Sequence, residues 1–371
     1  MMTTQRLPPS LTPLDAALAM LLDRLSPVAP GERPLAEALG CVAEGMPPLR
    51  ALPSRDVAAA DGFAFRARDL VGASSYSPLP LEQPPVWVEA GDPLPGDNDC
   101  VVDADLVEWS GALAQVVAEA IPGQGVRRAG QDIAEATAIM SAGWRLRALD
   151  LLVARAAGIK TLAIRRPRLH LVNVPTTAGD NVTTPFIAEL AEAAGAVVLR
   201  SDAAGRDAAS IAAALDAQPC DLRITVGGTG VGRSDATVAA LALRGEILAH
   251  GIALAPGRTT AIGKIDNIPV IALPGAPDQA LAAWWTVALP VLDRLSALQM
   301  RPALRLPLAR KIASGIGVTE IALLKKIDDS WMPLASGDLS LDAMVRADGW
   351  LAIPADSEGF AAAAPVNAYI V

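Results

Sequence analysis

The chain has 371 residues, a formal net charge of −9 and an apolar fraction of 52%, much of which is alanine. Its length is enough for roughly two to four domains, and its longest apolar tract falls short of the roughly 18–20 residues that a membrane span needs. The N-terminus lacks the apolar core of an export signal, so we expect a cytoplasmic protein with no membrane partner. The negative net charge and the lack of a run of basic residues disfavour a nucleic-acid partner.

The cysteines and histidines are few and widely spaced. Cys41, Cys100 and Cys220 form no CxxC pair, which argues against a disulfide framework and a zinc site. His170 and His250 are equally isolated, so we expect neither a histidine metal site nor a Ser–His–Asp triad. An anionic ligand remains compatible with the net charge if backbone N–H groups and a few cations converge locally.

Three helices are predicted in the first half of the chain. Residues 12–25 carry leucines at helical spacing, with Thr12 as the N-cap and Pro13 at the first helical position. Residues 34–44 predict a second, short helix, and residues 148–157 predict a third.

The composition changes between residues 46 and 125, where prolines and glycines are frequent. Short strand-like runs occur at 86–90, 100–109 and 113–120. We expect this segment to be an inserted β-rich domain. The flanking helices would then pack together as a helical connector, formed by residues 1–45 with residues 126–165.

The next part of the chain, residues 166–298, alternates strand and helix signals. The strand signals lie at 169–174, 196–201, 222–230 and 268–277, and the helix signals lie at 185–195, 208–217 and 236–244. This alternation predicts a mostly parallel sheet covered on both faces. Residues 299–371 predict short strands and therefore a small C-terminal β domain.

The strongest local feature is the run Ile224-Thr-Val-Gly-Gly-Thr-Gly-Val-Gly-Arg-Ser-Asp235, where a strand leads into glycines and then a helix. Glycines let backbone amides approach an anion, and ligands of open α/β sheets bind at the carboxyl ends of strands. The run fits neither the P-loop nor the GxGxxG pattern. Thr229 and Ser234 can donate hydrogen bonds and Arg233 adds charge, whereas Asp235 is either a helix N-cap or a metal or pterin contact.

This run resembles the ligand loop in the molybdopterin-binding domains of the MogA and MoeA proteins. Further segments resemble the MoeA family of molybdopterin molybdenumtransferases, which includes the gephyrin E domain. They are Ala60-Asp-Gly-Phe-Ala64 (family MDGYA), Ala90-Gly-Asp-Pro-Leu-Pro95 with Cys100-Val-Val (TGxPLP…AVV), Val126-Arg-Arg-Ala-Gly-Gln-Asp-Ile133 (VRRxGEDI), Leu273-Pro-Gly-Ala-Pro277 (LPGNP) and Arg346-Ala-Asp-Gly349 (RADG). The matches keep the family order over nearly the whole chain.

The resemblance implies a multidomain α/β fold. A helical connector and an inserted β domain would precede a MogA-like three-layer α/β molybdopterin-binding domain and a C-terminal β-barrel-like domain, usually in a homodimer. It also implies a reaction in which adenylyl-molybdopterin and molybdate react with Mg²⁺ present, the adenylyl bond is cleaved and molybdenum remains on the pterin dithiolene. The site would lie between the α/β domain of one subunit and the β domain of the other.

The resemblance also implies site residues. Asp61, Asp132 and Asp235 match family acidic positions and would be catalytic ligands of Mg²⁺. The alternative for Asp61 and Asp132 is a turn aspartate, and for Asp207, which also matches an acidic position, a helix N-cap. The implied pterin-binding residues are Gly227, Gly228, Thr229, Gly230, Gly232, Ser234, Arg258, Pro274 and Gly275.

The departures from the family pattern cluster in the predicted pocket. The family's KPGKP reads Ala255-Pro-Gly-Arg-Thr259, so one lysine is Ala255 and the other is Arg258, which is not equivalent to lysine. The asparagine of LPGNP is Ala276, and the glutamate of the family's GDEL motif is absent from Val174-Pro-Thr-Thr-Ala-Gly-Asp-Asn181.

Two functions therefore stay open. One is a divergent transferase of molybdenum cofactor biosynthesis, and the other is a non-catalytic molybdopterin carrier that serves a molybdoenzyme client. An adenylyltransferase of the MogA type is disfavoured by the additional domains. Trp284-Trp285, on a predicted helix, is expected to pack in the core or in a dimer contact rather than against the pterin.

Overall fold

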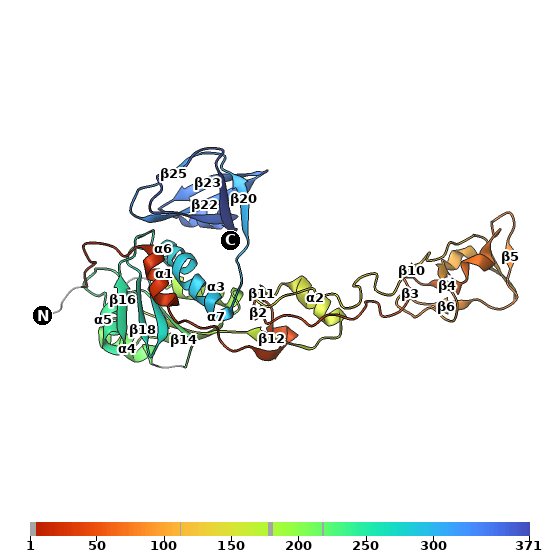
Figure 1. Cartoon of the computed structure of the whole chain (residues 1–371), viewed down its shortest axis with the longest axis horizontal. Coiled ribbons are helices and arrows are strands. Elements are labelled where there is room, and N and C mark those ends of the chain that lie inside the picture. Colours follow the sequence, from red (N-terminus) through yellow and green to blue (C-terminus); the bar gives the residue numbers. More distant parts are fainter. Residues whose placement is uncertain (1–4, 112, 177–180, 217–218) are drawn as a thin grey trace. The chain divides into compact units, whose positions relative to one another are not determined.

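The computed structural model describes residues 5–111, 113–176, 181–216 and 219–371 (Figure 1). The chain divides into two compact units. The first contains Met1–Gly45, Ala142–Leu151 and Thr161–Val371, and the second contains Met46–Ser141 and Leu152–Lys160. None of the helices in the described ranges reaches the length and hydrophobicity of a membrane span.

The second unit is built from short antiparallel strands. One sheet has the order β6-β4-β7, another the order β5-β9-β8, and β3 pairs with β10. The strands are β3 (Val57–Ala58), β4 (Gly62–Phe65), β5 (Leu79–Pro80), β6 (Val86–Val88), β7 (Cys100–Val102), β8 (Val107–Ser110), β9 (Leu113–Val116) and β10 (Val126–Arg127), with 3₁₀ turns at Ala67–Leu70 and Ala104–Leu106. Phe65, Cys100 and Val116 belong to its main apolar core.

The first unit contains a six-stranded sheet in the order β14-β13-β15-β19-β18-β16. Its strands are β13 (Arg168–Asn173), β14 (Val197–Asp202), β15 (Leu222–Val226), β16 (Glu246–His250), β18 (Ala261–Ile265) and β19 (Ile268–Leu273). Strands β14, β13, β15 and β19 are parallel, which confirms the predicted sheet. The antiparallel strands β18 and β16 are not predicted by the sequence pattern, although Asp266 and Asn267, both at positive φ, form the turn into β19.

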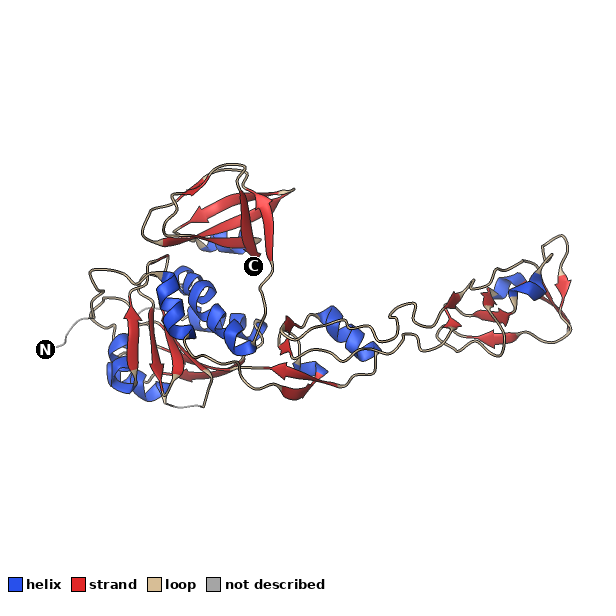
Figure 2. Ribbon diagram, in the orientation of Figure 1, coloured by secondary structure: helices blue, strands red, loops and turns tan. Residues whose placement is uncertain are grey.

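Helices cover both faces of this sheet, so the domain has three layers (Figure 2). Side chains alternate along a strand, and in β13 Leu171 belongs to one core while Val172 belongs to the other. The Val172 core includes residues of α4 and α5, and the Leu171 core includes residues of the remaining helices. The helices are α1 (Leu14–Leu22), α3 (Thr183–Ala193), α4 (Ala208–Leu215), α5 (Thr237–Arg244), α6 (Pro277–Ala283) and α7 (Leu289–Ser296), with one π-helical turn (Trp284–Ala288) between α6 and α7.

The predicted helical connector differs from the structure in two ways: residues 34–44 form no α-helix, and the first predicted helix packs in the core of the α/β domain. Residues 34–44 form no α-helix, because Pro34 ends a strand and Gly40 has a φ of 76° after a single 3₁₀ turn. The segment instead contributes to a four-stranded antiparallel sheet in the order β1-β12-β2-β11. The elements are β1 (Gly31–Pro34), the 3₁₀ turn Leu35–Glu37, β2 (Val42–Ala43), β11 (Trp144–Arg145) and β12 (Thr161–Arg165), and the predicted third helix is α2 (Ala148–Ala156).

Helix α1 belongs to the α/β domain rather than to the connector. Its residues Ala17 and Leu21 are fully buried in the same core as α7, because the apolar stripe of the helix packs there. Thr12 is not its N-cap. The Thr12 N–H donates to the Gly251 oxygen over 2.9 Å, and Pro13 occupies the N-cap position.

The C-terminal part of the first unit is a β domain, and one strand of the preceding α/β segment, β17, pairs with its strand β22. Its main sheet has the order β17-β22-β24-β26-β20, with β23 paired to β22, and β21 pairs separately with β25. The elements are β17 (Leu254–Ala255), β20 (Ala303–Pro307), β21 (Ile312–Ala313), β22 (Thr319–Ile327), β23 (Ser330–Ser336), α8 (Leu341–Arg346), β24 (Gly349–Ile353), β25 (Gly359–Phe360) and β26 (Pro365–Ile370).

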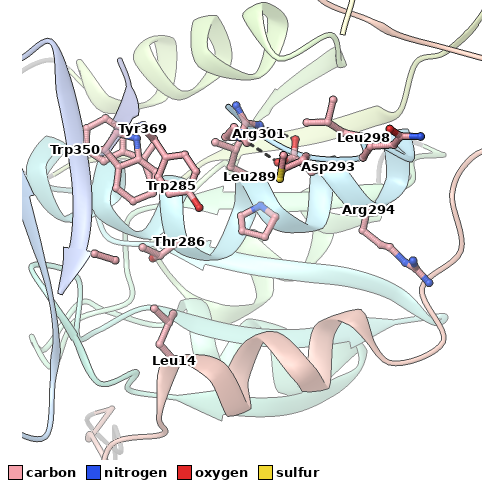
Figure 3. A pocket seen from close by; sticks show the side chains of 14 residues that line it. Leu14, Trp285, Thr286, Leu289, Asp293, Arg294, Leu298, Arg301, Trp350 and Tyr369 are labelled. Atoms are coloured by element: carbon pink, nitrogen blue, oxygen red, sulfur yellow. Dashed lines mark hydrogen bonds and ion pairs between the residues drawn. The ribbon is translucent and has the colours of Figure 1, made fainter. Parts of the chain in front are cut away.

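An aromatic stack joins this β domain to the α/β domain. The rings of Trp285 and Trp350 lie 4.8 Å apart and are nearly parallel, and Tyr369 packs on the other side of Trp350 (Figure 3). Beside the stack lies a cavity of about 420 Å³, in which Arg301 is paired with Asp293 over 2.6 Å. Trp284 and Trp285 are 1% and 8% exposed, so the predicted core packing of the two tryptophans is confirmed.

Candidate anion-binding site

The glycine-rich run begins where β15 ends at the carboxyl edge of the parallel strands. Gly227 and Gly228 have φ values of 101° and 69°, which favour glycine. The Gly227 N–H donates to the Leu273 oxygen over 2.9 Å, which ties the loop to the end of β19. A Cβ on Gly275 would lie 3.5 Å from the Gly227 Cα. The structure therefore places the predicted glycine loop and the predicted Pro274-Gly275 turn side by side.

The first residue of α5 holds the start of the loop. The Thr237 hydroxyl donates to the Gly227 oxygen over 2.8 Å, and the Thr237 N–H donates to the Gly228 oxygen over 3.1 Å. A Cβ on Gly228 would lie only 2.4 Å from the Thr237 Oγ1. Only glycine fits at this position, because the loop backbone and α5 approach so closely.

Two further side chains hold the next two carbonyl groups. His250, at the end of β16, lies with its Nε2 3.1 Å from the Thr229 oxygen, and this nitrogen must carry the proton because a carbonyl oxygen only accepts. Gln5 donates from its Nε2 to the Gly230 oxygen over 2.7 Å. Thus the carbonyl oxygens of residues 227–230 all accept hydrogen bonds from the protein.

These bonds determine where the loop amides point. In a trans peptide, the C=O of one residue and the N–H of the next point in opposite directions. The N–H groups of residues 228–231 therefore face away from Thr237, His250 and Gln5. Among the residues that the structure describes, none of these four N–H groups has a hydrogen-bond acceptor. Unpaired N–H groups in succession are a binding arrangement for anions.

Asp235 closes the outer part of the loop. Its Oδ2 accepts the Gly232 N–H over 2.9 Å, and its Oδ1 accepts a hydrogen bond from Arg206 over 3.0 Å. The two side chains are 17% and 23% exposed, respectively. Ala236, not Asp235, occupies the N-cap of α5, so that alternative is wrong. Each oxygen of Asp235 thus accepts one hydrogen bond from this chain and keeps a second lone pair for another partner.

The predicted cation Arg258 lies in the turn beside the loop. Its neighbour Thr259 places its Oγ1 3.3 Å from the Oγ1 of the buried Thr229. Arg258 itself is exposed, and no carboxylate of the described residues pairs with its guanidinium. Ser234 and Gly232 are also exposed, on the outer side of the loop. The turn that carries Arg258 therefore lies against the loop whose amides are unpaired.

The aspartates predicted from the other unit each bind local backbone or a neighbouring arginine. The Asp61 Oδ1 accepts the Ala90 N–H over 2.8 Å, and the Asp132 Oδ2 lies 3.4 Å from Arg127. Within the described part of one chain, no group of three or more His, Cys, Asp or Glu side chains could hold a metal ion. The three predicted magnesium ligands, Asp61, Asp132 and Asp235, therefore remain a prediction.

Asp207 has the local role that the sequence left as an alternative. It is the N-cap of α4, where its side chain accepts hydrogen bonds from the Ser210 hydroxyl over 2.6 Å and from the Ser210 N–H over 3.0 Å. These bonds hold the pKa of Asp207 below its ordinary value. The segment that replaces the GDEL motif is described only in part, because residues 177–180 lie outside the described ranges.

The sequence reasoning missed the side chains that orient the loop, namely Gln5, Arg206, Thr237 and His250. Thr237 could have been found from its place directly after the glycine run. Gln5, Arg206 and His250 carry no motif, because their partners lie at least 21 residues away in the chain.

Comparisons with known proteins agree with this picture. The model of the MoeA N-terminal region (domain I and II) matches residues 12–158, and that of a probable molybdopterin binding domain matches residues 169–294. The chain is 27% identical to a molybdopterin molybdenumtransferase of Synechococcus elongatus over 95% of both chains. It is 29% identical to molybdopterin molybdenumtransferase 2 of Mycobacterium tuberculosis over 68% of this chain and 71% of that one.

Solved structures show the same fold. The crystal structure of a molybdopterin biosynthesis moeA protein from Pyrococcus horikoshii OT3 aligns over 98% of this chain and all of that chain, with a TM-score of 0.69 at 21% identity. A second structure of such a protein, with its source printed as Pyrococcus horikosii, aligns over 97% and 99% with a TM-score of 0.64 at 25% identity.

One departure in the site has a measurable consequence for stability. Ala276 occupies the N-cap of α6 in the extended conformation that an N-cap requires, but it offers no side-chain acceptor. Ala276→Asn should therefore stabilise the protein by about 1 kcal/mol, because an asparagine oxygen can accept one of the free N–H groups of the first turn. Urea unfolding measures the change. Ala276→Val, which adds bulk without an acceptor, is the control, and equal stabilities of the two variants would contradict the prediction.

Proposed function

The chain belongs to the MoeA-like family, and we propose that it acts in molybdenum cofactor biosynthesis as a molybdopterin molybdenumtransferase. One observation carries the proposal: the four N–H groups of residues 228–231 lack acceptors among the described residues. They lie in the segment that matches the molybdopterin-binding model. Molybdopterin carries a terminal phosphate, which is the kind of anion that such a row of amides binds.

In this proposal the loop binds the phosphate and Arg258 binds the oxyanion. The phosphate oxygens accept hydrogen bonds from the amides of residues 228–231, while the Thr229 hydroxyl is held by Thr259 at the base of the loop. A guanidinium has a fork of donors that can grip molybdate or phosphate through two parallel hydrogen bonds. Arg258 thus supplies the positive charge that the family places on a lysine, from a position three residues after Ala255.

The reaction takes adenylyl-molybdopterin and molybdate. Water cleaves the bond between the adenylyl group and the molybdopterin phosphate and AMP leaves, while the two dithiolene thiols replace one molybdate oxygen, which leaves as water with the two thiol protons. The contribution of the described residues is to hold the phosphate still and to offset its negative charge with oriented N–H dipoles, which favours charge developing at this group. The carrier alternative rests on Ala255 and Ala276, whereas the names of the relatives favour the transferase.

A turnover assay tests the proposed function. Purified protein supplied with adenylyl-molybdopterin, Mg²⁺ and molybdate should release AMP above a no-protein control. Arg258→Gln should raise the molybdate concentration for half-maximal release about tenfold, because a charged hydrogen-bond donor is lost. Arg310→Gln, which removes another exposed arginine, is the control and should behave as the unmodified protein. If the protein bound molybdopterin but released no AMP, the result would contradict the transferase function and support the carrier function.

We also propose a homodimer in which Mg²⁺ is held by Asp61 and Asp132 of one subunit and Asp235 of the other. Two subunits are invoked because the described residues of one chain form no metal cluster. Carboxylate oxygens are the ligands that magnesium prefers. The cytoplasmic location and a client molybdoenzyme stay predictions from the sequence.

Mixed dimers test the shared site. A chelator should abolish AMP release, and Asp61→Asn and Asp235→Asn should each lower it at least about tenfold, whereas Asp97→Asn, an exposed carboxylate of the same unit as Asp61, should not. Mixing the two inactive variants should restore about a quarter of the activity, because half of the dimers are mixed and each has one intact site. Chelator-resistant turnover, or no recovery on mixing, would exclude this arrangement.

A further inference from the structure

The N-terminal segment runs along the α/β domain toward the glycine loop. The Thr12 N–H and C=O both bond the turn after β16, at Gly251 and Ala253, over 2.9 and 2.8 Å. A Cβ on Gly251 would lie 3.0 Å from the Leu7 and Leu11 side chains, so these leucines pack closely on the same turn. These contacts fix the path of the segment and place Gln5 at the loop.

The side chain of Gln5 is bonded at both of its ends. Its Nε2 donates to the Gly230 oxygen over 2.7 Å and lies 3.4 Å from the Gly228 oxygen, and its Oε1 accepts the Val238 N–H over 3.2 Å. Val238 is the second residue of α5, whose N-cap, Ala236, has no side-chain acceptor. Gln5 therefore does for α5 what a serine or asparagine N-cap does in other helices.

Gln5 thus links the helix start to the loop carbonyls. When the Gly228 and Gly230 oxygens are held toward Gln5, the N–H groups of Thr229 and Val231 must point the opposite way. Without Gln5, the Gly230 oxygen loses its only hydrogen-bond donor among the described residues. Glycine imposes little conformational preference of its own, so the peptide after Gly230 could then rotate.

We infer that Gln5 is a positioning residue for the phosphate of molybdopterin, and this inference rests on the proposed function. Gln5 does not bind the phosphate, because both ends of its amide are occupied by the chain. It acts through the peptide groups that follow Gly228 and Gly230, whose N–H groups it turns toward the ligand. The N-terminal segment therefore sets the affinity of a loop that lies more than 220 residues away in the sequence.

The inference is tested by measuring the affinity of the Gln5→Met variant for two ligands, molybdopterin and the same pterin without its phosphate. Methionine keeps the length of the side chain but has no amide donor or strong acceptor. We expect the affinity for molybdopterin to fall about tenfold, while the affinity for the same pterin without its phosphate stays unchanged. Ser10→Ala, an exposed position of the same segment, is the control and should change neither affinity. A purely structural role would weaken both pterins equally or lower the thermal midpoint alone, and either result would overturn the inference.

Amide hydrogen exchange without ligand separates this inference from the proposed function. In Gln5→Met, exchange should speed up at Val238, whose acceptor is removed, and at Thr237, whose acceptor sits on the loosened loop. Unchanged exchange at both residues would refute the positioning role, even if pterin binding were impaired. If the unmodified protein failed to bind molybdopterin, the proposed function would fall, whereas the exchange data would still decide whether Gln5 orders the loop.

Discussion

The orientation of the peptide groups in residues 227–231 is the constraint on which the site depends. A backbone loop can bind an anion only if its N–H groups, not its carbonyl groups, face the ligand. In this chain, hydrogen bonds from Thr237, His250 and Gln5 hold the four successive carbonyl oxygens of residues 227–230 on the side opposite to the free N–H groups. The glycines permit the conformation, but the hydrogen bonds select it. The loop is therefore prepared before any ligand arrives, which reduces the entropy cost of binding.

The three side chains that hold the loop come from distant parts of the fold. Thr237 begins α5, His250 ends the antiparallel edge strand β16, and Gln5 precedes α1. The edge of the sheet thus has a role beyond packing, since it carries the histidine to the loop. Arg206 and Asp235 add a partly buried ion pair that fixes the outer turn.

Local sequence signals predicted the elements that have strong local causes. The parallel strands and their helices follow from apolar runs separated by glycine and polar turns, and the glycine loop follows from its composition. The connector was mispredicted because Pro34 and Gly40 interrupt an alanine-rich run that otherwise favours a helix. The contacts of Asp235 could not be predicted from the sequence, because its partner Arg206 lies 29 residues away. The N–H group of Val238 at the start of α5 is bonded by Gln5 instead of by Asp235. The side chains that orient the site act through tertiary contacts, which leave no pattern in a single sequence.

A crystal structure of the protein with bound molybdopterin would show whether the backbone of residues 228–231 binds the phosphate. We expect phosphate oxygens within about 3 Å of those four amide nitrogens, with the carbonyl oxygens of residues 227–230 still bonded to Thr237, His250 and Gln5. A phosphate held elsewhere, or a loop that has turned its carbonyl groups toward the ligand, would contradict this expectation.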